Sequence, residues 1–125
     1  MYTYVIIDDE PLIRRGTKKK LEPLSHLLTC CGEASDGREG LELVRQLKPD
    51  IVILDMQMPV MDGCTATQRI RALKDPARAA VPIVAMTANV FEEERKRPFD
   101  CGMNGFLSKP IVIEELIDAL KDIIH

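Results

Sequence analysis

The stretch Ile51-Val52-Ile53-Leu54-Asp55 decides the fold of this chain. Four consecutive apolar residues, most of them β-branched, are typical of a strand that is buried on both faces. Pro49-Asp50 precedes this run, and the carboxylate of Asp55 ends it. Because both faces of such a strand must be covered, the stretch indicates a sheet with helices on either side.

Further short apolar runs alternate with longer amphipathic stretches along the chain. The runs predict strands over residues 4–7, 30–34, 83–86 and 105–107. The amphipathic stretches predict helices over about residues 11–22, 36–47, 62–73, 90–101 and 113–124. Strict alternation of this kind predicts one α/β domain over residues 1–125, a three-layer (βα)5 doubly wound parallel sheet.

Several helix boundaries can also be predicted. Ser35 or Asp36 can cap the second helix, and Asp62 can cap the third. Pro23 breaks or kinks the first helix near its end. Pro98 would remove a backbone hydrogen bond from the interior of the fourth helix, so we expect that helix to end or kink before Pro98.

Composition excludes several classes of protein. The formal net charge is −3 and the pI is about 5.4, which argues against a nucleic-acid-binding module. The basic cluster of Arg14, Arg15 and Lys18-Lys19-Lys20 is interpreted as a solvated helix face. No apolar run is long enough to span a bilayer, so membrane insertion is not expected.

The cysteines show neither a CxxC pair nor metal-ligand spacing with histidine; they are Cys30, Cys31, Cys64 and Cys101. Adjacent Cys30 and Cys31 are poor disulfide partners, and no secretory signal precedes them. We therefore expect a reducing, cytoplasmic setting.

Polar residues follow the predicted strands at the points where each one ends: Asp8 and Asp9, Asp55, Thr87, and Lys109. Ligands of open α/β sheets bind at the carboxyl ends of the strands, where the strand order reverses. In the common order 2-1-3-4-5, the first and third strands are neighbours there, so the three aspartates would share one pocket. Three close carboxylates repel one another, and the single ammonium of Lys109 does not balance them. A hard divalent cation such as Mg²⁺ is the expected remedy.

Four segments resemble the signature segments of response-regulator receiver domains: residues 6–11 (IIDDEP), 54–63 (LDMQMPVMDG), 85–89 (AMTAN) and 108–110 (SKP). They occur in the family's order, each at a predicted strand end, and the resemblance covers nearly the whole chain. The family implies the flavodoxin-like, CheY-like fold with strand order 2-1-3-4-5. The middle and end of the chain look most like receivers of hybrid sensor histidine kinases, whereas the start looks more like receivers of transcription regulators.

The resemblance also implies roles for single residues. Asp55 is similar to the phosphoacceptor, Thr87 and Lys109 to the groups that bind phosphoryl oxygens, and Phe106 to the switch aromatic. The metal ligands implied for Mg²⁺ (or Mn²⁺) are Asp8, Asp9, Asp55 and the backbone carbonyl of Gln57. Gln57 and Asn89 could tune the phosphoryl lifetime, and the Lys109-Pro110 bond is expected to be cis.

These roles imply a phosphorelay switch and not an enzyme with an external product. Asp55 would take a phosphoryl group from a phosphohistidine of a histidine kinase or phosphotransfer domain. Thr87 would then be drawn inward and Phe106 would move behind it, which changes the face of the fourth helix, fifth strand and fifth helix. That face is a possible homodimer contact.

Two rival interpretations require residues that this chain lacks. A haloacid-dehalogenase-type enzyme needs a second Asp two positions after the nucleophile, where this chain has Gln57. A flavodoxin-like cofactor binder needs a Gly/Ser/Thr-rich first loop, where this chain has Asp8-Asp9-Glu10. A phosphorylation-independent, receiver-like docking module stays open, as does the setting: a stand-alone receiver, part of a hybrid kinase, or part of a transcription regulator. Met56, Met58 and Met61 are interpreted as gap-filling residues and not as a soft-metal site.

Overall fold

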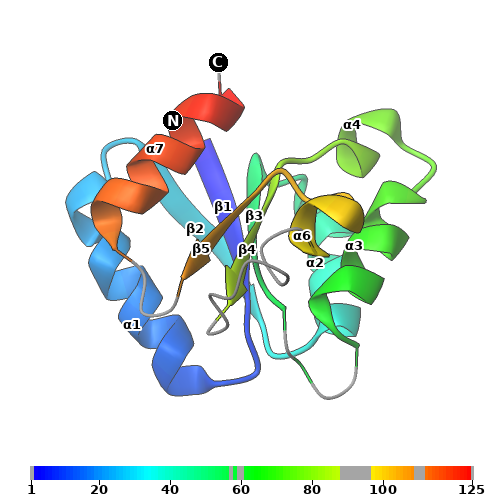
Figure 1. Ribbon diagram of the computed structural model, residues 1–125, viewed down its shortest axis with the longest axis horizontal. Coiled ribbons are helices and arrows are strands. Elements are labelled where there is room, and N and C mark those ends of the chain that lie inside the picture. Colours follow the sequence, from blue (N-terminus) through cyan, green and yellow to red (C-terminus); the bar gives the residue numbers. More distant parts are fainter. Residues whose placement is uncertain (1, 57, 59–60, 88–96, 109–111, 125) are drawn as a thin grey trace.

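The computed structural model describes residues 2–56, 58, 61–87, 97–108 and 112–124 (Figure 1). These residues form a five-stranded parallel sheet in the order β2-β1-β3-β4-β5, as predicted. The strands are β1 (Tyr2–Ile7), β2 (Leu28–Ala34), β3 (Ile51–Asp55), β4 (Ile83–Thr87) and β5 (Gly105–Ser108). The fold class is therefore confirmed.

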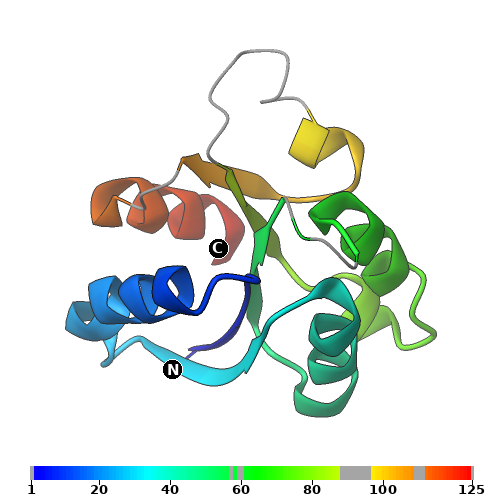
Figure 2. The same cartoon turned by 90° about the horizontal axis from the view of Figure 1, so that it is seen from below.

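Helices cover both faces of this sheet and make three layers. They are α1 (Pro11–Leu21), the 3₁₀ turn η1 (Glu22–Leu24), α2 (Gly37–Leu47), α3 (Gly63–Arg71), α4 (Pro76–Ala79), α6 (Arg97–Asp100) and α7 (Ile113–Ile124). Figure 2 shows α1 and α7 on one face, with α2, α3 and α6 on the other. The short helix α4 was not predicted.

Strand β3 lies in the middle of the sheet and faces a core on each side. All of its residues are buried. Val52 and Leu54 belong to the core that includes Val44 of α2 and Ile70 of α3. Ile51 and Ile53 belong to the opposite core. Because side chains alternate along a strand, the uninterrupted apolar run supplies both cores at once.

Two predicted caps are present at the amino ends of helices. The Asp36 carboxylate accepts a hydrogen bond from the backbone N–H of Glu39 at 2.9 Å. The Asp62 carboxylate accepts one from the N–H of Thr65 at 2.8 Å. Both contacts satisfy amides that have no partner within the helix, so each fixes where the helix begins.

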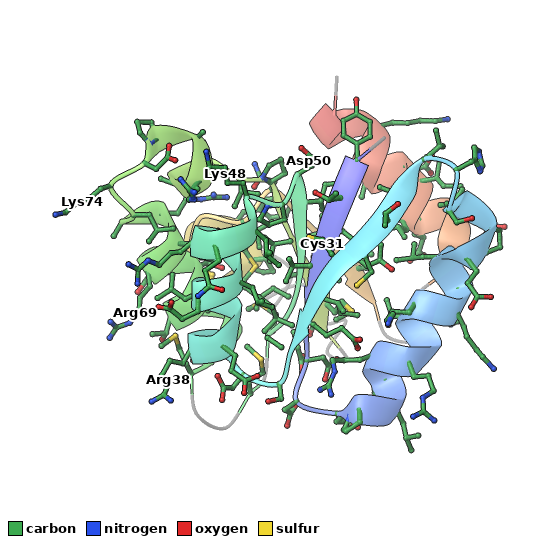
Figure 3. The ribbon with its side chains drawn as sticks, turned by 180° about the vertical axis from the view of Figure 1, so that it is seen from behind. Cys31, Arg38, Lys48, Asp50, Arg69 and Lys74 are labelled. Carbon is green, nitrogen blue, oxygen red and sulfur yellow. A yellow bond between two sulfur atoms is a disulfide. The ribbon has the colours of Figure 1, made fainter. Side chains whose placement is uncertain are left out.

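At the amino ends of the strands, β1 is tied to the residues before β3. The Asp50 carboxylate accepts from the backbone N–H of Thr3 at 2.7 Å, and the Asp50 N–H donates to the Thr3 carbonyl at 3.0 Å. Lys48 ends α2 with the left-handed φ of 48°, which turns the chain toward this contact. Figure 3 shows Lys48 and Asp50 at the same end of the sheet.

Arg71, the last residue of α3, links four segments of the chain. Its guanidinium donates to the carbonyls of Gly102 (3.0 Å), Ala79 (2.8 Å) and Val81 (2.7 Å), and to Oδ1 of Asn104 (2.8 Å). The same Asn104 oxygen accepts from the N–H of Ile83 at 2.9 Å. Burial lowers the pKa of Arg71. This planar, five-donor group therefore holds α3 against α4, the start of β4 and the turn before β5.

The predicted break before Pro98 concerns residues 88–96, which lie outside the described residues, so it stays a prediction. Among the described residues, Pro98 lies in the first turn of α6 (Arg97–Asp100). Proline costs no hydrogen bond in a first turn, because those amides have no partner within the helix. The first helix does end at Leu21, and Pro23 lies in the 3₁₀ turn that follows it.

The structure contains a disulfide that the spacing of the cysteines did not predict. Cys64 of α3 and Cys101, just after α6, are joined by a disulfide with a Cα–Cα separation of 5.4 Å. The two cysteines are 37 residues apart in the sequence, so their spacing gave no indication that they lie close together. Cys30 and Cys31 are free, as expected. Within the described part of the chain, no helix has the length and apolar character that a membrane span requires.

Candidate functional site

The parallel register brings three of the predicted site residues, Asp8, Asp55 and Thr87, together at the carboxyl ends of the strands. Ile7 of β1 pairs with Leu54 of β3, so Asp8 and Asp55 each come one position later at adjacent strand ends. Asp55 pairs with Met86 of β4, and Thr87 follows. Asp8 is 0 % exposed, Asp55 3 % and Thr87 6 %. Two carboxylates and a hydroxyl are thus buried where ligands of such sheets bind.

The loop after β1 gathers acidic side chains. Carboxylate oxygens of Asp8, Asp9 and Glu10 lie within 4.8 Å of one another. Asp8 Oδ1 also accepts a hydrogen bond from the backbone N–H of Glu10 at 2.9 Å, which folds the loop around it. Asp55, on the neighbouring strand, is not a member of this mutually close group. The arrangement offers hard oxygen ligands of the kind that Mg²⁺ takes in proteins.

Arg14 is a site residue that sequence reasoning assigned only to a solvated helix face. Its guanidinium donates to the backbone carbonyl of Asp8. Its Nε lies 3.5 Å from a carboxylate oxygen of Glu33, which also pairs with Lys18 at 2.9 Å. The hydrogen bond that the Lys18 ammonium donates to Glu33 raises the pKa of Lys18. Arg14 therefore anchors the loop after β1 to β2, and no local pattern pairs a helix residue with a strand residue this far along the chain.

Helix α3 begins directly against the backbone of the predicted phosphoacceptor. The N–H of Gly63 donates to the carbonyl of Met56 at 3.1 Å. A Cβ at Gly63 would lie 2.6 Å from the carbonyl oxygen of Asp55 and 2.9 Å from Cα of Met56. Met56 and Met58 are buried in the core and Met61 packs against it, so these methionines fill gaps as predicted.

Gly63→Ala is expected to destabilise the domain by about 1–3 kcal/mol, because the added methyl group meets backbone atoms that cannot rotate away. Urea unfolding measures the change. Gly16→Ala in α1 is the matched control, since a Cβ there has no atom within 4 Å. The control should stabilise the protein by about 0.5–1 kcal/mol, as alanine favours helix over glycine. Equal effects of both substitutions would contradict the close approach of α3 to Asp55.

The predicted switch aromatic lies on the strand next to Thr87. Phe106 of β5 pairs with Ala85, and Thr87 pairs with Ser108. The Phe106 ring is partly buried and meets the ring of Phe99 in α6 edge to face, with centroids 6.1 Å apart. Phe99 itself is 52 % exposed. Because the two rings are in contact, a movement of one ring changes the packing of the other.

Several predicted features lie outside the described residues. These are the Gln57 carbonyl, the Lys109 ammonium, Asn89 and the Lys109-Pro110 peptide bond. The structure brings Asp8, Asp55 and Thr87 to the carboxyl ends of neighbouring strands, and it places Phe106 within β5, in register with Ala85. The roles assigned to these residues stay predictions.

Comparison with known proteins agrees with this geometry. The family described as "Response regulator receiver domain" matches residues 4–121. The chain belongs to this receiver family. The resemblance inferred from the four signature segments is thereby confirmed.

Curated relatives of this receiver include both kinds of protein suggested by its segments. It is 37 % identical over 116 residues to the sensor histidine kinase RcsC of Salmonella typhi, covering 93 % of this chain and 12 % of the relative. It is 34 % identical over 118 residues to the nitrate/nitrite response regulator NarL of Escherichia coli, covering 94 % of this chain and 52 % of the relative. The receiver thus spans only part of the length of each relative.

Solved structures share the whole receiver fold. A putative response regulator from Chloroflexus aurantiacus matches with a TM-score of 0.86 and 28 % identity, covering 98 % of this chain and 97 % of that one. The receiver domain of sensor histidine kinase PA1611 from Pseudomonas aeruginosa matches with a TM-score of 0.85 and 28 % identity, covering 98 % and 97 %. That structure is described with a magnesium ion coordinated in its active-site cleft.

Proposed function

We propose that this receiver accepts a phosphoryl group on Asp55 from a phosphohistidine and relays the event as a change of shape. The observation that carries the proposal is the position of Asp55, buried at the carboxyl end of β3 and next to the strand that Asp8 follows. A carboxylate held there faces the edge of the sheet at which ligands bind, and it is shielded from competing water.

The proposed reaction is nucleophilic displacement at phosphorus. An Asp55 carboxylate oxygen attacks in line, the P–N bond of the phosphohistidine breaks, and the imidazole of the donor leaves with the electron pair. The product is an acyl phosphate, which water later hydrolyses to restore the carboxylate. The domain acts once on itself in this scheme, so kinase activity belongs to another domain or a partner.

The acidic residues of the site fit a divalent cation. Asp8 and Asp9 present close oxygen ligands, and Asp55 and the Gln57 carbonyl would complete the set. Mg²⁺, or Mn²⁺ in its place, would neutralise charge on the phosphoryl oxygens when bound. The magnesium described for the PA1611 receiver, a relative of the same fold, supports this assignment.

The remaining proposed roles concern stabilisation and output. The Thr87 hydroxyl would donate to one phosphoryl oxygen and the Lys109 ammonium to another. Movement of Thr87 toward the phosphoryl group would leave space for Phe106, which lies on the adjacent strand. The face that includes β5 and α7 would then change, and we propose it as the surface for a homodimer contact.

The partners follow from the same chemistry. The phosphoryl donor would be a histidine kinase or a histidine phosphotransfer domain, and we propose a cytoplasmic setting, where such donors are phosphorylated by ATP. The acidic net charge of −3 offers no support for nucleic-acid contact by this domain.

Incubation with Mg²⁺ and acetyl phosphate tests the proposal. We expect the intact mass to rise by one phosphoryl group, and the adduct to be lost in hydroxylamine, which cleaves acyl phosphates. Chelation of the metal by EDTA should prevent the adduct. A mass that never changes, with the protein folded by circular dichroism, would overturn the proposal in favour of a phosphorylation-independent docking module.

A further inference from the structure

The disulfide between Cys64 and Cys101 joins two segments that no proposed role of the receiver has used. Cys64 lies in the first turn of α3 and Cys101 follows α6, and both side chains are partly buried. Figures 1 and 2 both show α6 beside α3. The Cα–Cα distance of 5.4 Å is within the range of ordinary disulfides, so the backbone already positions the two sulfurs to react.

Contacts other than the disulfide keep these segments together. Residues 64 and 71 are two turns apart on one side of α3. Arg71 donates from that side to the carbonyl of Gly102 at 3.0 Å and to Oδ1 of Asn104 at 2.8 Å. The chain immediately after Cys101 is thus bound to α3 without any covalent link. A reduced pair would remain close, so the bond can form and break while the fold persists.

The pair joins a segment that contacts the backbone next to the predicted phosphoacceptor to a segment that contacts the predicted switch aromatic. On one side, Cys64 follows Gly63, whose N–H donates to the carbonyl of Met56 directly after Asp55. On the other side, Cys101 follows α6, which carries the Phe99 ring against Phe106. A covalent link at this point fixes the neighbour of Phe106 relative to the backbone of Asp55.

We propose that Cys64 and Cys101 form a reversible thiol–disulfide site that reacts with low-molecular-weight disulfides such as oxidised glutathione, and that the disulfide opposes phosphorylation of Asp55. The second half rests on the proposed function. In a reducing setting such bonds are typically transient and regulatory, which suits a pair that the fold holds together in either state.

The reaction balances as two exchanges. The thiolate of one cysteine attacks oxidised glutathione, which forms a mixed disulfide and releases one glutathione thiolate. The second cysteine thiolate then attacks the protein sulfur and displaces the other glutathione. Two protein thiols are oxidised to one disulfide, and one oxidised glutathione is reduced to two molecules of glutathione.

Thermodynamic linkage gives the direction of the effect. If phosphorylation requires Phe106 to move, a bond that fixes the segment packed on Phe106 raises the free energy of the phosphorylated form. By reciprocity, that bond disfavours the phosphorylated form. Allosteric couplings of this kind are about fivefold or more in affinity.

The other two cysteines supply an internal comparison. Cys30 and Cys31 lie on β2, and Figure 3 shows Cys31 on that strand. Burial raises the pKa of the Cys31 thiol, so its reactive thiolate is scarcer. The structure therefore predicts that oxidation selects Cys64 and Cys101, whose backbones are already at disulfide distance, over Cys31.

Thiol mapping tests the site itself. The full chain is reduced, incubated with oxidised glutathione, alkylated with iodoacetamide under denaturing conditions and digested. We expect a Cys64–Cys101 linked peptide, two alkylated cysteines on β2, and full reversal by dithiothreitol. Cys64→Ser and Cys101→Ser should each stop at a mixed disulfide with glutathione, whereas Cys30→Ser should behave as wild type. Four free thiols, or a bond that involves Cys30 or Cys31, would overturn the site.

Two further measurements test the coupling. Amide hydrogen exchange should be slower at residues 101–107 in the oxidised protein than in the reduced protein. Beryllofluoride with Mg²⁺, a phosphoryl mimic, should bind the oxidised form about fivefold more weakly, and the Cys64→Ser/Cys101→Ser variant should ignore glutathione. Equal affinities would overturn the coupling. If neither form binds beryllofluoride or takes a phosphoryl group, the proposed function fails, while thiol mapping and exchange still decide the redox site.

Discussion

Replacement of Asp55 by asparagine is expected to abolish the phosphoryl adduct while the domain stays folded. The amide has nearly the size of the carboxylate, so the side chain at the end of β3 keeps its volume. It lacks the anionic oxygen that attacks phosphorus, so no acyl phosphate can form. Intact mass after incubation with Mg²⁺ and acetyl phosphate measures the loss, and a thermal melt reports on the fold.

Asp36→Asn is the matched control for this substitution. Asp36 follows β2 at the same edge of the sheet and caps α2 through the N–H of Glu39. Asparagine caps helices about as well as aspartate, so this variant should gain the adduct and melt like wild type. An adduct of wild-type extent in Asp55→Asn would assign the chemistry to a different carboxylate, whereas its loss in both variants would point to damage of the fold.

Arg71→Met is expected to lower the free energy of unfolding by about 3 kcal/mol, which corresponds to a fall of about 10 °C in Tm. Methionine keeps much of the apolar stem but removes every donor of the guanidinium. The hydrogen bonds to the carbonyls of Ala79 and Val81 are partly buried, whereas the one to Gly102 is exposed. Because a buried polar group left without a partner costs about 1–3 kcal/mol, we expect the carbonyls of Ala79 and Val81 to account for most of the loss. Urea denaturation measures the difference.

Arg69→Met tests whether loss of a charge from α3 is enough to produce this effect. Figure 3 shows the Arg69 side chain directed away from the body of the domain. Substitution of such a surface residue usually changes stability by less than about 0.5 kcal/mol. Arg71→Lys adds a second comparison, because one ammonium cannot reach four acceptors placed around a planar fork. Equal stability of all three variants would contradict the structural role of Arg71.

Local patterns predicted most of the sheet and its helices. The apolar run of β3, the caps at Asp36 and Asp62, and the amphipathic repeat of α7 are each encoded within a few neighbouring residues. Strand β2 was the weakest of the predicted strands. The strand begins at Leu28, two residues before the predicted start. The prediction started too late because the exposed polar residues Thr29 and Glu33 interrupt the apolar pattern of the strand.

The contacts that sequence reasoning missed join residues distant in the chain. Arg14 reaches Glu33 on β2, Arg71 reaches Gly102, and Cys64 meets Cys101. An arginine on an amphipathic helix has the same local pattern whether it contacts solvent or a buried carbonyl. The predicted edge of the site, by contrast, needed only strand ends and their order, and the register of β1, β3 and β4 is as expected.

The contact between Thr3 and Asp50 marks the edge of the sheet opposite to the acidic loop. Helix α3 ends at that same edge, so the exposed Lys74 lies a full helix length away from Gly63 and Asp55. Protein engineers could therefore treat Lys74 as an attachment point. A fluorescent reporter inserted there would be carried by α3, the helix that rests on Asp55, without occupying the site, and the domain could serve as the sensing half of a biosensor.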